Sequence, residues 1–426
     1  MKSNFLLFYF ILFCLPVIAQ STEKGETYLY GRKIVDTLAS AEMRGRGYVN
    51  DGGAKAASFI REEFKKLGFK PITSNYYQSF SFPMNTFPSE ISVEFDNQKL
   101  IAGKDYIVSP SSPSAKDQGT IVVADDQLVM KKKKYKKFIN QDFSKKILYI
   151  NDTGKLTKEL HDLPLLIKKP KAIVIAKDKL TWSVSQKVSE FPTIEVLRDG
   201  NVIPKVMSFD IESKYISEFA SQNVIGLVEG SVFPDSFIVF TAHYDHLGQM
   251  GSDVYFPGAN DNASGSAMLL SLAKYYSMPA HKPSYSIVFM AFCGEEAGLL
   301  GSKYYTEHPV FSLNRIRFLL NMDIMGTGEE GITVVNGSLF TTEFDKLKQI
   351  NAENHFIKDV KIRGKAANSD HSPFTEKGVK AFFIYSMGGI KAYHDIYDKP
   401  ETLPLNEFDH LYRLIIKFGD FLQQVN

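Results

Sequence analysis

The sequence contains few cysteines. Among its 426 residues only Cys14 and Cys293 occur. Two cysteines cannot supply the dense disulfide framework of a small secreted domain, so the fold has to depend on a large apolar core or on bound metal. Cys293 ends an apolar run, which favours a buried packing residue; a nucleophilic thiol is the alternative.

No charge of one sign is in excess. Fifty Lys and Arg residues stand against 48 Asp and Glu residues, for a net charge of +2. At the level of the whole chain this balance argues against a nucleic-acid partner. The most basic stretch, MKKKKYKKF at 130–138, indicates either a site for an anionic partner or a solvated helix or loop. The second interpretation is favoured because one short charge run specifies little.

The apolar run at the N-terminus is too short to span a bilayer. The segment MKSNFLLFYFILFCLPVIAQ has one lysine, an apolar core from Phe5 to Phe13, and a small residue, Ala19, before Gln20. This layout predicts a secretory signal peptide over residues 1–19, a periplasmic or extracellular location, and no integral membrane span in the mature chain. A lipid anchor on Cys14 is the alternative, which the bulky Phe13 argues against.

Hydrophobic patterning predicts an α/β domain over residues 20–99 and 211–426 and a smaller β-rich inserted domain over 100–210. Residues 31–47 and 54–69 are predicted to be helical. Strand candidates at 119–126, 145–152, 170–177 and 192–197 alternate with lysine-rich stretches. After residue 211, apolar strands alternate with amphipathic helices. That alternation is typical of a mainly parallel central sheet with helices on both faces.

Polar residues follow three of the apolar strands. The strands SFIVFTA, YSIVFMAF and IRFLLNM are followed by His243 and Asp245, by Glu295 and Glu296, and by Asp323, respectively. Two further candidates lie in loops, Asp261 in FPGANDNASG and His394 in KAYHDIYDKPETL. Ligands of such sheets bind outside the carboxyl ends of the strands, so these side chains are expected to converge.

Imidazoles and carboxylates together suit zinc, although cobalt or manganese fits the same ligands. Five ligands are too many for one catalytic zinc and suit two zinc ions if one carboxylate bridges them. Such a centre needs a proton acceptor, and Glu295, next to a ligand, is the candidate general base. Asp245 is a candidate to hold the second ring nitrogen of His243; a purely structural hydrogen bond is the alternative.

The series AHYDH, GANDNASG, FCGEEAGLLGS, NMD, SDHSPF and YHDIYD resembles the secreted di-zinc aminopeptidases related to bacterial leucyl aminopeptidase, over residues 25–95 and 211–426. The resemblance implies a zinc exopeptidase fold and a metal-ligand set of His243, Asp261, Glu296, Asp323 and His394. In this set His243 and Asp323 hold one zinc, Glu296 and His394 hold the other, and Asp261 bridges. It further implies Glu295 as general base, Asp245 as the orienting acid, and a cis peptide bond after Asp261.

Three further assignments come from the same resemblance. Tyr393 matches a position where some relatives place a phenol that stabilises an oxyanion, and a packing role is the alternative. Asp370 and His371 match a motif at the rim of the substrate pocket, and a helix-capping aspartate is the alternative. Residues 100–210 resemble a protease-associated domain.

The sequence thus predicts an exported metallo-aminopeptidase that binds two zinc ions and acts on peptides with a free N-terminus. A single-zinc glutaminyl cyclase on the same fold is one alternative, and a catalytically silent binding protein is another. No pattern predicts an oligomeric state.

Overall fold

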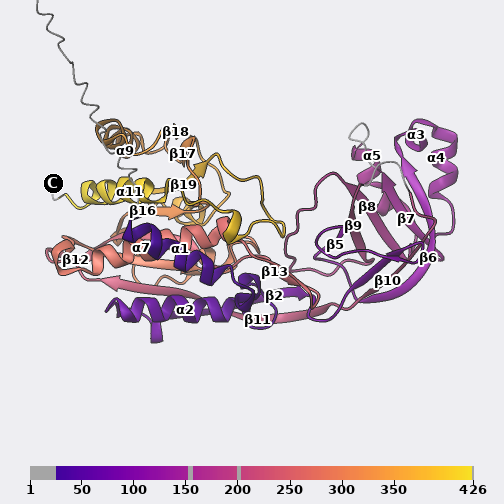
Figure 1. The fold of residues 1–426 in the computed structure, drawn as a ribbon, viewed down its shortest axis with the longest axis horizontal. Helices are drawn as coiled ribbons and strands as arrows, with labels where there is room; N and C mark the ends of the chain where they lie inside the picture. Colours follow the sequence, from indigo (N-terminus) through magenta and orange to yellow (C-terminus); the bar gives the residue numbers. More distant parts are fainter. Residues whose placement is uncertain (1–24, 152–156, 199–202, 425–426) are drawn as a thin grey trace, which may run out of the picture.

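A computed structural model describes residues 25–151, 157–198 and 203–424. Two β-sheets form two units that lie side by side (Figure 1). The predicted signal peptide and Cys14 lie outside the described residues. Within the described part, no helix combines the length and the apolar character needed to cross a bilayer.

The first unit contains the larger sheet, whose strand order is β1-β11-β15-β12-β16-β19-β17-β18, with β2 also paired to β11. Its strands are β1 (Lys70–Pro71), β2 (Tyr77–Thr86), β11 (Lys214–Val228), β12 (Phe233–His243), β15 (Tyr285–Phe292), β16 (Ile316–Met322), β17 (Gly331–Val335), β18 (Val360–Ile362) and β19 (Ala381–Met387). Its helices are α1 (Glu26–Leu38), α2 (Gly52–Lys66), α7 (Gly265–Ser277), α8 (Leu300–Glu307), α9 (Thr341–Asn354), α10 (His371–Glu376) and α11 (Phe408–Leu422). A small hairpin pairs β13 (Gly248–Met250) with β14 (Val254–Phe256).

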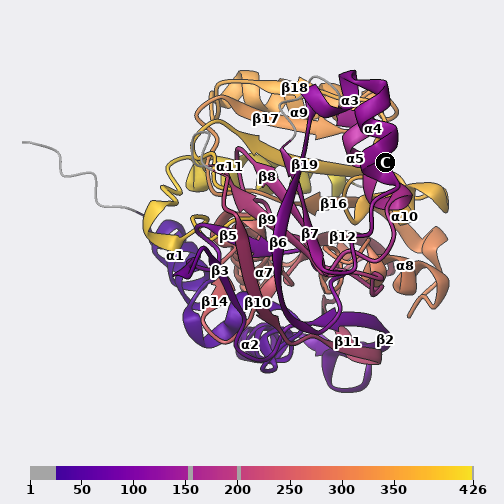
Figure 2. The same ribbon diagram turned by 90° about the vertical axis from the view of Figure 1, so that its right-hand side faces the viewer.

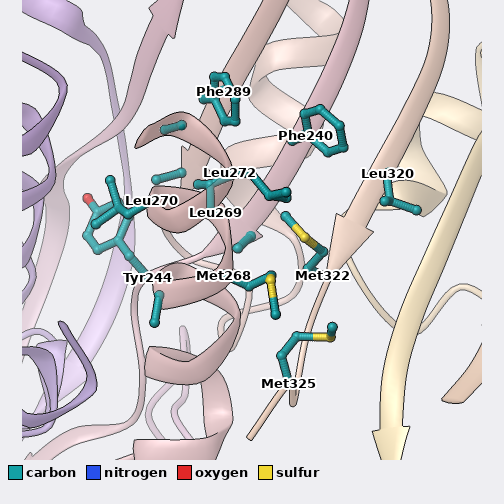
Figure 3. Close-up of a cluster of buried hydrophobic side chains, with 14 of the residues drawn as sticks. Phe240, Tyr244, Met268, Leu269, Leu270, Leu272, Phe289, Leu320, Met322 and Met325 are labelled. Atoms are coloured by element: carbon teal, nitrogen blue, oxygen red, sulfur yellow. The ribbon is translucent and has the colours of Figure 1, made fainter. Parts of the chain in front are cut away.

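The central strands β15, β12, β16 and β19 pair in parallel, whereas β11 and β17 join them antiparallel. The predicted α/β class with a parallel centre is therefore confirmed. Side chains along each central strand point alternately to opposite sides of the sheet. Helices cover both sides, so both sets of side chains are buried. In β15, Phe289 and Ala291 belong to one buried cluster, and Val288 and Met290 belong to another. Figure 3 shows the first cluster, where α7 packs its leucines against the sheet.

The predicted helix over 31–47 is wrong in its second half. Helix α1 ends at Leu38, and Ala41–Arg46 forms a short 3₁₀ segment with positive φ at Arg44 and Gly45. The reason is tertiary: the turn brings the guanidinium of Arg46 into the interior, where it is completely buried.

The second unit is built on a sheet of order β4-β3-β10-β6-β7-β8-β9-β5 and faces the viewer in Figure 2. Its strands are β3 (Ser92–Phe95), β4 (Gln98–Lys99), β5 (Tyr106–Val108), β6 (Ala115–Asp125), β7 (Lys146–Asn151), β8 (Ala172–Lys177), β9 (Thr193–Leu197) and β10 (Val206–Ile211). Its helices are α3 (Asp126–Met130), α4 (Lys132–Ile139), α5 (Thr157–His161) and α6 (Leu163–Leu166). The lysine-rich stretch forms α4, whose lysines are exposed while Phe138 is buried, in agreement with a solvated helix.

The chain passes between the two units along an antiparallel ribbon of β2 and β11. Paired residues run from Thr86 with Lys214 to Tyr77 with Val224. The register shifts between Ile216 and Phe219. The two units are therefore connected by paired strands and not by a loose linker (Figure 1).

Candidate metal centre

The predicted ligands lie at one edge of the larger sheet. Strand β12 lies between β15 and β16 and runs parallel to both, so the residues that follow these three strands meet at the same edge. His243 is the last residue of β12, and Asp323 directly follows β16. Asp261 lies in a π-helical turn, Ala259–Ser264, that precedes α7. The peptide bond between Asp261 and Asn262 is cis, as the resemblance implies.

Asp261 stands between two imidazoles. Its Oδ1 is 3.5 Å from His243 Nε2, and its Oδ2 is 3.2 Å from His394 Nε2. On one side, His243 Nε2 is also 3.3 Å from Asp323 Oδ1. On the other side, His394 Nε2 is 3.2 Å from Glu296 Oε2. The five predicted ligands thus converge, and Asp261 presents one oxygen to each half of the cluster.

Both imidazoles are oriented through the nitrogen that faces away from Asp261. His243 Nδ1 lies 3.1 Å from the main-chain oxygen of Asp245, and His394 Nδ1 lies 3.1 Å from that of Trp182. A carbonyl oxygen can only accept, so Nδ1 of each ring is the donor. Each Nε2 faces the carboxylates and is the nitrogen that would bind a metal ion in the neutral ring.

The carboxylate of Asp245 lies next to His243, on the side of its Nδ1 atom. Its Oδ1 is 3.7 Å from His243 Nδ1 and accepts a hydrogen bond from the main-chain N–H of Glu295 at 3.2 Å. Tyr48 donates its hydroxyl to Asp245 Oδ2 at 3.1 Å. Asp245 therefore connects the His243 loop to the loop that carries Glu295.

Glu295 and Glu296 are adjacent in sequence and have opposite electrostatic environments. Burial raises the pKa of Glu295 well above its usual value, and its carboxylate lies in one group with His243 and Asp323. Burial would also raise the pKa of Glu296. The hydrogen bonds and charges of His246 and His394 outweigh burial, however, and hold the pKa of Glu296 well below its usual value. The two neighbouring carboxylates therefore differ in how firmly they hold a proton.

His246 and Asp398 also build the site, and sequence reasoning missed both. His246 Nδ1 is 2.7 Å from Glu296 Oε1, the oxygen that does not face His394. Asp398 accepts hydrogen bonds from the main-chain N–H groups of Asn260 and Asp261 at 2.9 and 3.0 Å. His246 lies in the quoted AHYDH motif and Asp398 in the quoted YHDIYD motif, so their proximity to ligands was the available signal.

The buried side chain of Arg46 binds the main chain of the loop that contains Asp261. Its guanidinium donates hydrogen bonds to main-chain oxygens of Leu38, Tyr244, Pro257, Gly258 and Asp261 at distances from 2.7 to 3.2 Å. Burial lowers the pKa of Arg46 to about 10, opposed by the charges of Asp261 and other carboxylates of the cluster. The positive charge of Arg46 is therefore held close to the carboxylates of the cluster.

Tyr393 lies at the open side of the cluster. Its ring stacks on that of His394, with centroids 4.0 Å apart and planes 11° apart, and 46% of its surface is exposed. Burial, followed by the charges of Asp261 and Glu296, raises the pKa of its hydroxyl. The phenol therefore keeps its proton and remains a hydrogen-bond donor at neutral pH.

Asp370 and His371 are both fully buried, and Asp370 is near enough to His243 and Asp323 for their charges to affect its pKa. Ser302 donates its hydroxyl to Asp370 Oδ1 at 2.5 Å, and burial raises the pKa of Asp370 to about 7. The ring of His371 lies 5.3 Å from that of Phe383. Their role at a substrate pocket stays a prediction.

His371 should make the protein sensitive to acid. Burial lowers its folded-state pKa from 6.5 to about 4, so the unfolded chain takes up the proton first as pH falls. Stability from the neutral ring is fully present above pH 6.5 and is lost as pH falls toward 4. Between pH 7 and 4.5 the unfolding free energy of the wild type should therefore fall by about 2 kcal/mol more than that of His371→Phe. Urea unfolding of metal-free protein at both pH values measures this, with the exposed His355→Asn as control. Equal losses in the wild type and His371→Phe would contradict it.

The donor set fits a pair of metal ions. Imidazole nitrogens and carboxylate oxygens are ligands for zinc, and two groups of such atoms can be distinguished, one around His243 and one around Glu296. Among the described residues, no lysine or arginine side chain forms an ion pair with these carboxylates, and their direct partners are imidazoles. Several buried carboxylates so close together are costly, and bound cations would offset that cost.

The sheet with a parallel centre and the imidazole–carboxylate cluster at its carboxyl edge agree with the class of metallopeptidase hydrolases. Residues 223–419, a little less than half of the chain, match the model of peptidase family M28. The matched segment contains the five predicted ligands and Glu295. It begins after residues 100–210, whose assignment as a protease-associated domain stays a prediction.

Relatives agree with this class. The aminopeptidase YwaD of Bacillus subtilis strain 168 is 30% identical over 247 residues, 54% of this chain and 51% of the relative. The chain thus spans about half the length of that protein. A probable zinc metalloprotease of Pyrenophora teres f. teres is 34% identical over 137 residues, 29% of this chain and 28% of the relative.

Solved structures share the fold over nearly the whole chain. BSAP, a zinc aminopeptidase from Bacillus subtilis, superposes with a TM-score of 0.69 at 20% identity, over 92% of this chain and 94% of that one. A glutaminyl cyclase from an Acidobacteriales bacterium gives a TM-score of 0.52 at 16% identity, over 95% and 98% of the two chains. At these identities the similarity establishes the fold, which both kinds of enzyme share.

Proposed function

We propose that the protein is an exported aminopeptidase that uses two zinc ions to hydrolyse the first peptide bond of peptides with a free N-terminus. The position of Asp261 carries the proposal, because its two oxygens face His243 Nε2 and His394 Nε2 at 3.5 and 3.2 Å. A carboxylate in that position is suited to bridge two ions. The predicted signal peptide at residues 1–19 supports export.

The ligands would divide as the resemblance implies. His243 and Asp323 would hold one ion, His394 and Glu296 the other, and Asp261 both. When bound, the two ions would polarise the scissile carbonyl group and lower the pKa of a water molecule.

The remaining residues of the site would move protons and stabilise charge. Glu295 accepts a proton from the attacking water and later donates it to the leaving amine. Burial raises its pKa above that of a free glutamate, which is the direction that a group which both binds and releases a proton requires. Tyr393 keeps its hydroxyl proton and can donate a hydrogen bond to the oxyanion that develops on the former carbonyl.

Metal analysis together with two activity assays tests the proposal. Mass spectrometry is expected to find two zinc ions per chain, and a panel of chromogenic aminoacyl amides should be hydrolysed. N-acetylated forms of the same amides should resist hydrolysis, because they lack the free amino terminus. Cyclisation of an N-terminal glutamine without amide hydrolysis would instead indicate a glutaminyl cyclase. Two bound zinc ions with neither activity would indicate a binding protein.

A further inference from the structure

The connection between β8 and β9 leaves the sheet of the second unit. These two strands are parallel, so the chain needs a crossover between Lys177 and Thr193. Such crossovers usually contain a helix, whereas this one is irregular apart from a single β-bridge between Ser185 and Asn85. Irregular segments of this length inside a compact protein usually serve a function.

The crossover pairs with His394 of the first unit. The main-chain N–H of Trp182 donates to the main-chain oxygen of His394 at 2.8 Å. In return, His394 Nδ1 donates to the main-chain oxygen of Trp182 at 3.1 Å. His394 lies in a loop with a positive φ of 52°. The two hydrogen bonds therefore fix both the main chain and the ring of a predicted ligand.

Side chains of the crossover reach two ligand-bearing loops. Lys179 Nζ lies 3.1 Å from Asp395 Oδ2, one residue after His394. Gln186 Nε2 donates to the main-chain oxygen of Ala297, one residue after Glu296, at 2.6 Å. Both loops that would hold the second ion are thus in contact with the second unit.

Trp182 is itself held rigidly. Its indole stacks on Phe256, with centroids 4.7 Å apart and planes 16° apart, and its Nε1–H donates to the main-chain oxygen of Val108 at 2.7 Å. Only 4% of its surface is exposed. Phe256 belongs to β14 of the first unit and Val108 to β5 of the second, so the indole is anchored in both units.

We infer that residues 179–186 of the second unit form part of the metal centre and that Trp182 is a positioning residue for His394. The inference rests on the proposed function and deepens it, because it gives the inserted unit a role in one half of the site. Within the described part of the chain, the side-chain hydrogen bonds of His243 and Asp323 involve no residue of the crossover. Disturbing Trp182 should therefore affect the two ions unequally.

Zinc titration of the metal-free protein, with a chromogenic chelator as competitor, tests this. Trp182→Leu removes the stacking and the indole donor, and we expect one of the two binding steps to weaken by about 10- to 100-fold, as for the loss of a group that orients a ligand. The other step should stay within about twofold. Trp182→Phe keeps the stacking on Phe256 and should show a smaller loss in the same step.

Phe143→Leu is the matched control. Phe143 is fully buried in the second unit, packs against Phe138, and belongs to a different buried cluster from Trp182. It should lower the stability of that unit and leave both zinc-binding steps unchanged. If Trp182→Leu does not fold, the double variant Lys179→Met with Gln186→Ala replaces it. This variant should weaken the same zinc-binding step that Trp182→Phe weakens.

Unchanged or equally weakened steps in the Trp182 variants would overturn the inference. Failure of the proposed function gives a different result, because the wild type itself would then bind fewer than two zinc ions or hydrolyse no aminoacyl amide.

Discussion

Replacing Glu295 by glutamine is expected to lower kcat by about 10² to 10⁴-fold while two zinc ions stay bound. The amide keeps the size of the side chain and cannot accept a proton at neutral pH. Glu295 lies within the group that contains His243 and Asp323, so it is close enough to reach a water attacking at that half of the site. Steady-state hydrolysis of an aminoacyl amide measures the loss, and metal analysis shows whether both ions remain.

Glu296→Gln is the matched control for that variant. Glu296 lies between His246 and His394, with Oε1 2.7 Å from one ring and Oε2 3.2 Å from the other, and is placed to hold metal. Its replacement should lower the zinc content. Because a metal ion that binds the folded state stabilises it, the melting temperature measured in the presence of zinc should fall as well. Near-normal hydrolysis by Glu295→Gln would refute the division of roles between the two glutamates.

Arg46→Met is expected to lower the unfolding free energy of the metal-free protein by more than about 4 kcal/mol. The variant removes the Arg46 donor from main-chain oxygens of Leu38, Tyr244, Pro257, Gly258 and Asp261. Of these, the oxygen of Gly258 keeps the N–H of Ala263 as a donor at 3.2 Å. Each buried acceptor that loses its partner costs about 1–3 kcal/mol, less where the loop relaxes. Urea unfolding measures the change.

Arg44→Met provides the comparison for Arg46, because Arg44 lies in the same 3₁₀ segment and is exposed. It should change the unfolding free energy by less than about 0.5 kcal/mol, as is usual for surface substitutions. Zinc affinity should fall in Arg46→Met and stay constant in Arg44→Met, since Arg46 holds the loop of Asp261. Similar stabilities of the two variants would show that the buried hydrogen bonds are replaced by water.

Local sequence patterns predicted the centre of the sheet and the convergence of the ligands. Apolar runs such as Tyr285–Phe292 are long enough to specify strands buried on both faces, and parallel pairing brings the ends of those strands together. His243 and Asp323 could be placed in this way because each directly ends or follows such a strand. The loop residues Asp261 and His394 were candidates by residue type, and the family resemblance then implied their separate roles as ligands.

The supporting contacts could not be predicted in the same way. His246 lies three residues past His243, where β12 has ended and the alternation of a strand no longer says where a side chain points. Arg46 follows a helical pattern, and only packing against distant loops draws it inward. Trp182 and His394 are 212 positions apart, in different units, so no local periodicity relates them.

The paired strands β2 and β11 determine how the two units can move. A ladder that runs from Thr86 and Lys214 to Tyr77 and Val224 resists bending across its plane, so the two units should tumble in solution with one rotational correlation time. Any residual flexing would concentrate where the ladder is interrupted, between Ile216 and Phe219. Small-angle scattering should accordingly fit a single elongated particle and not a distribution of separations.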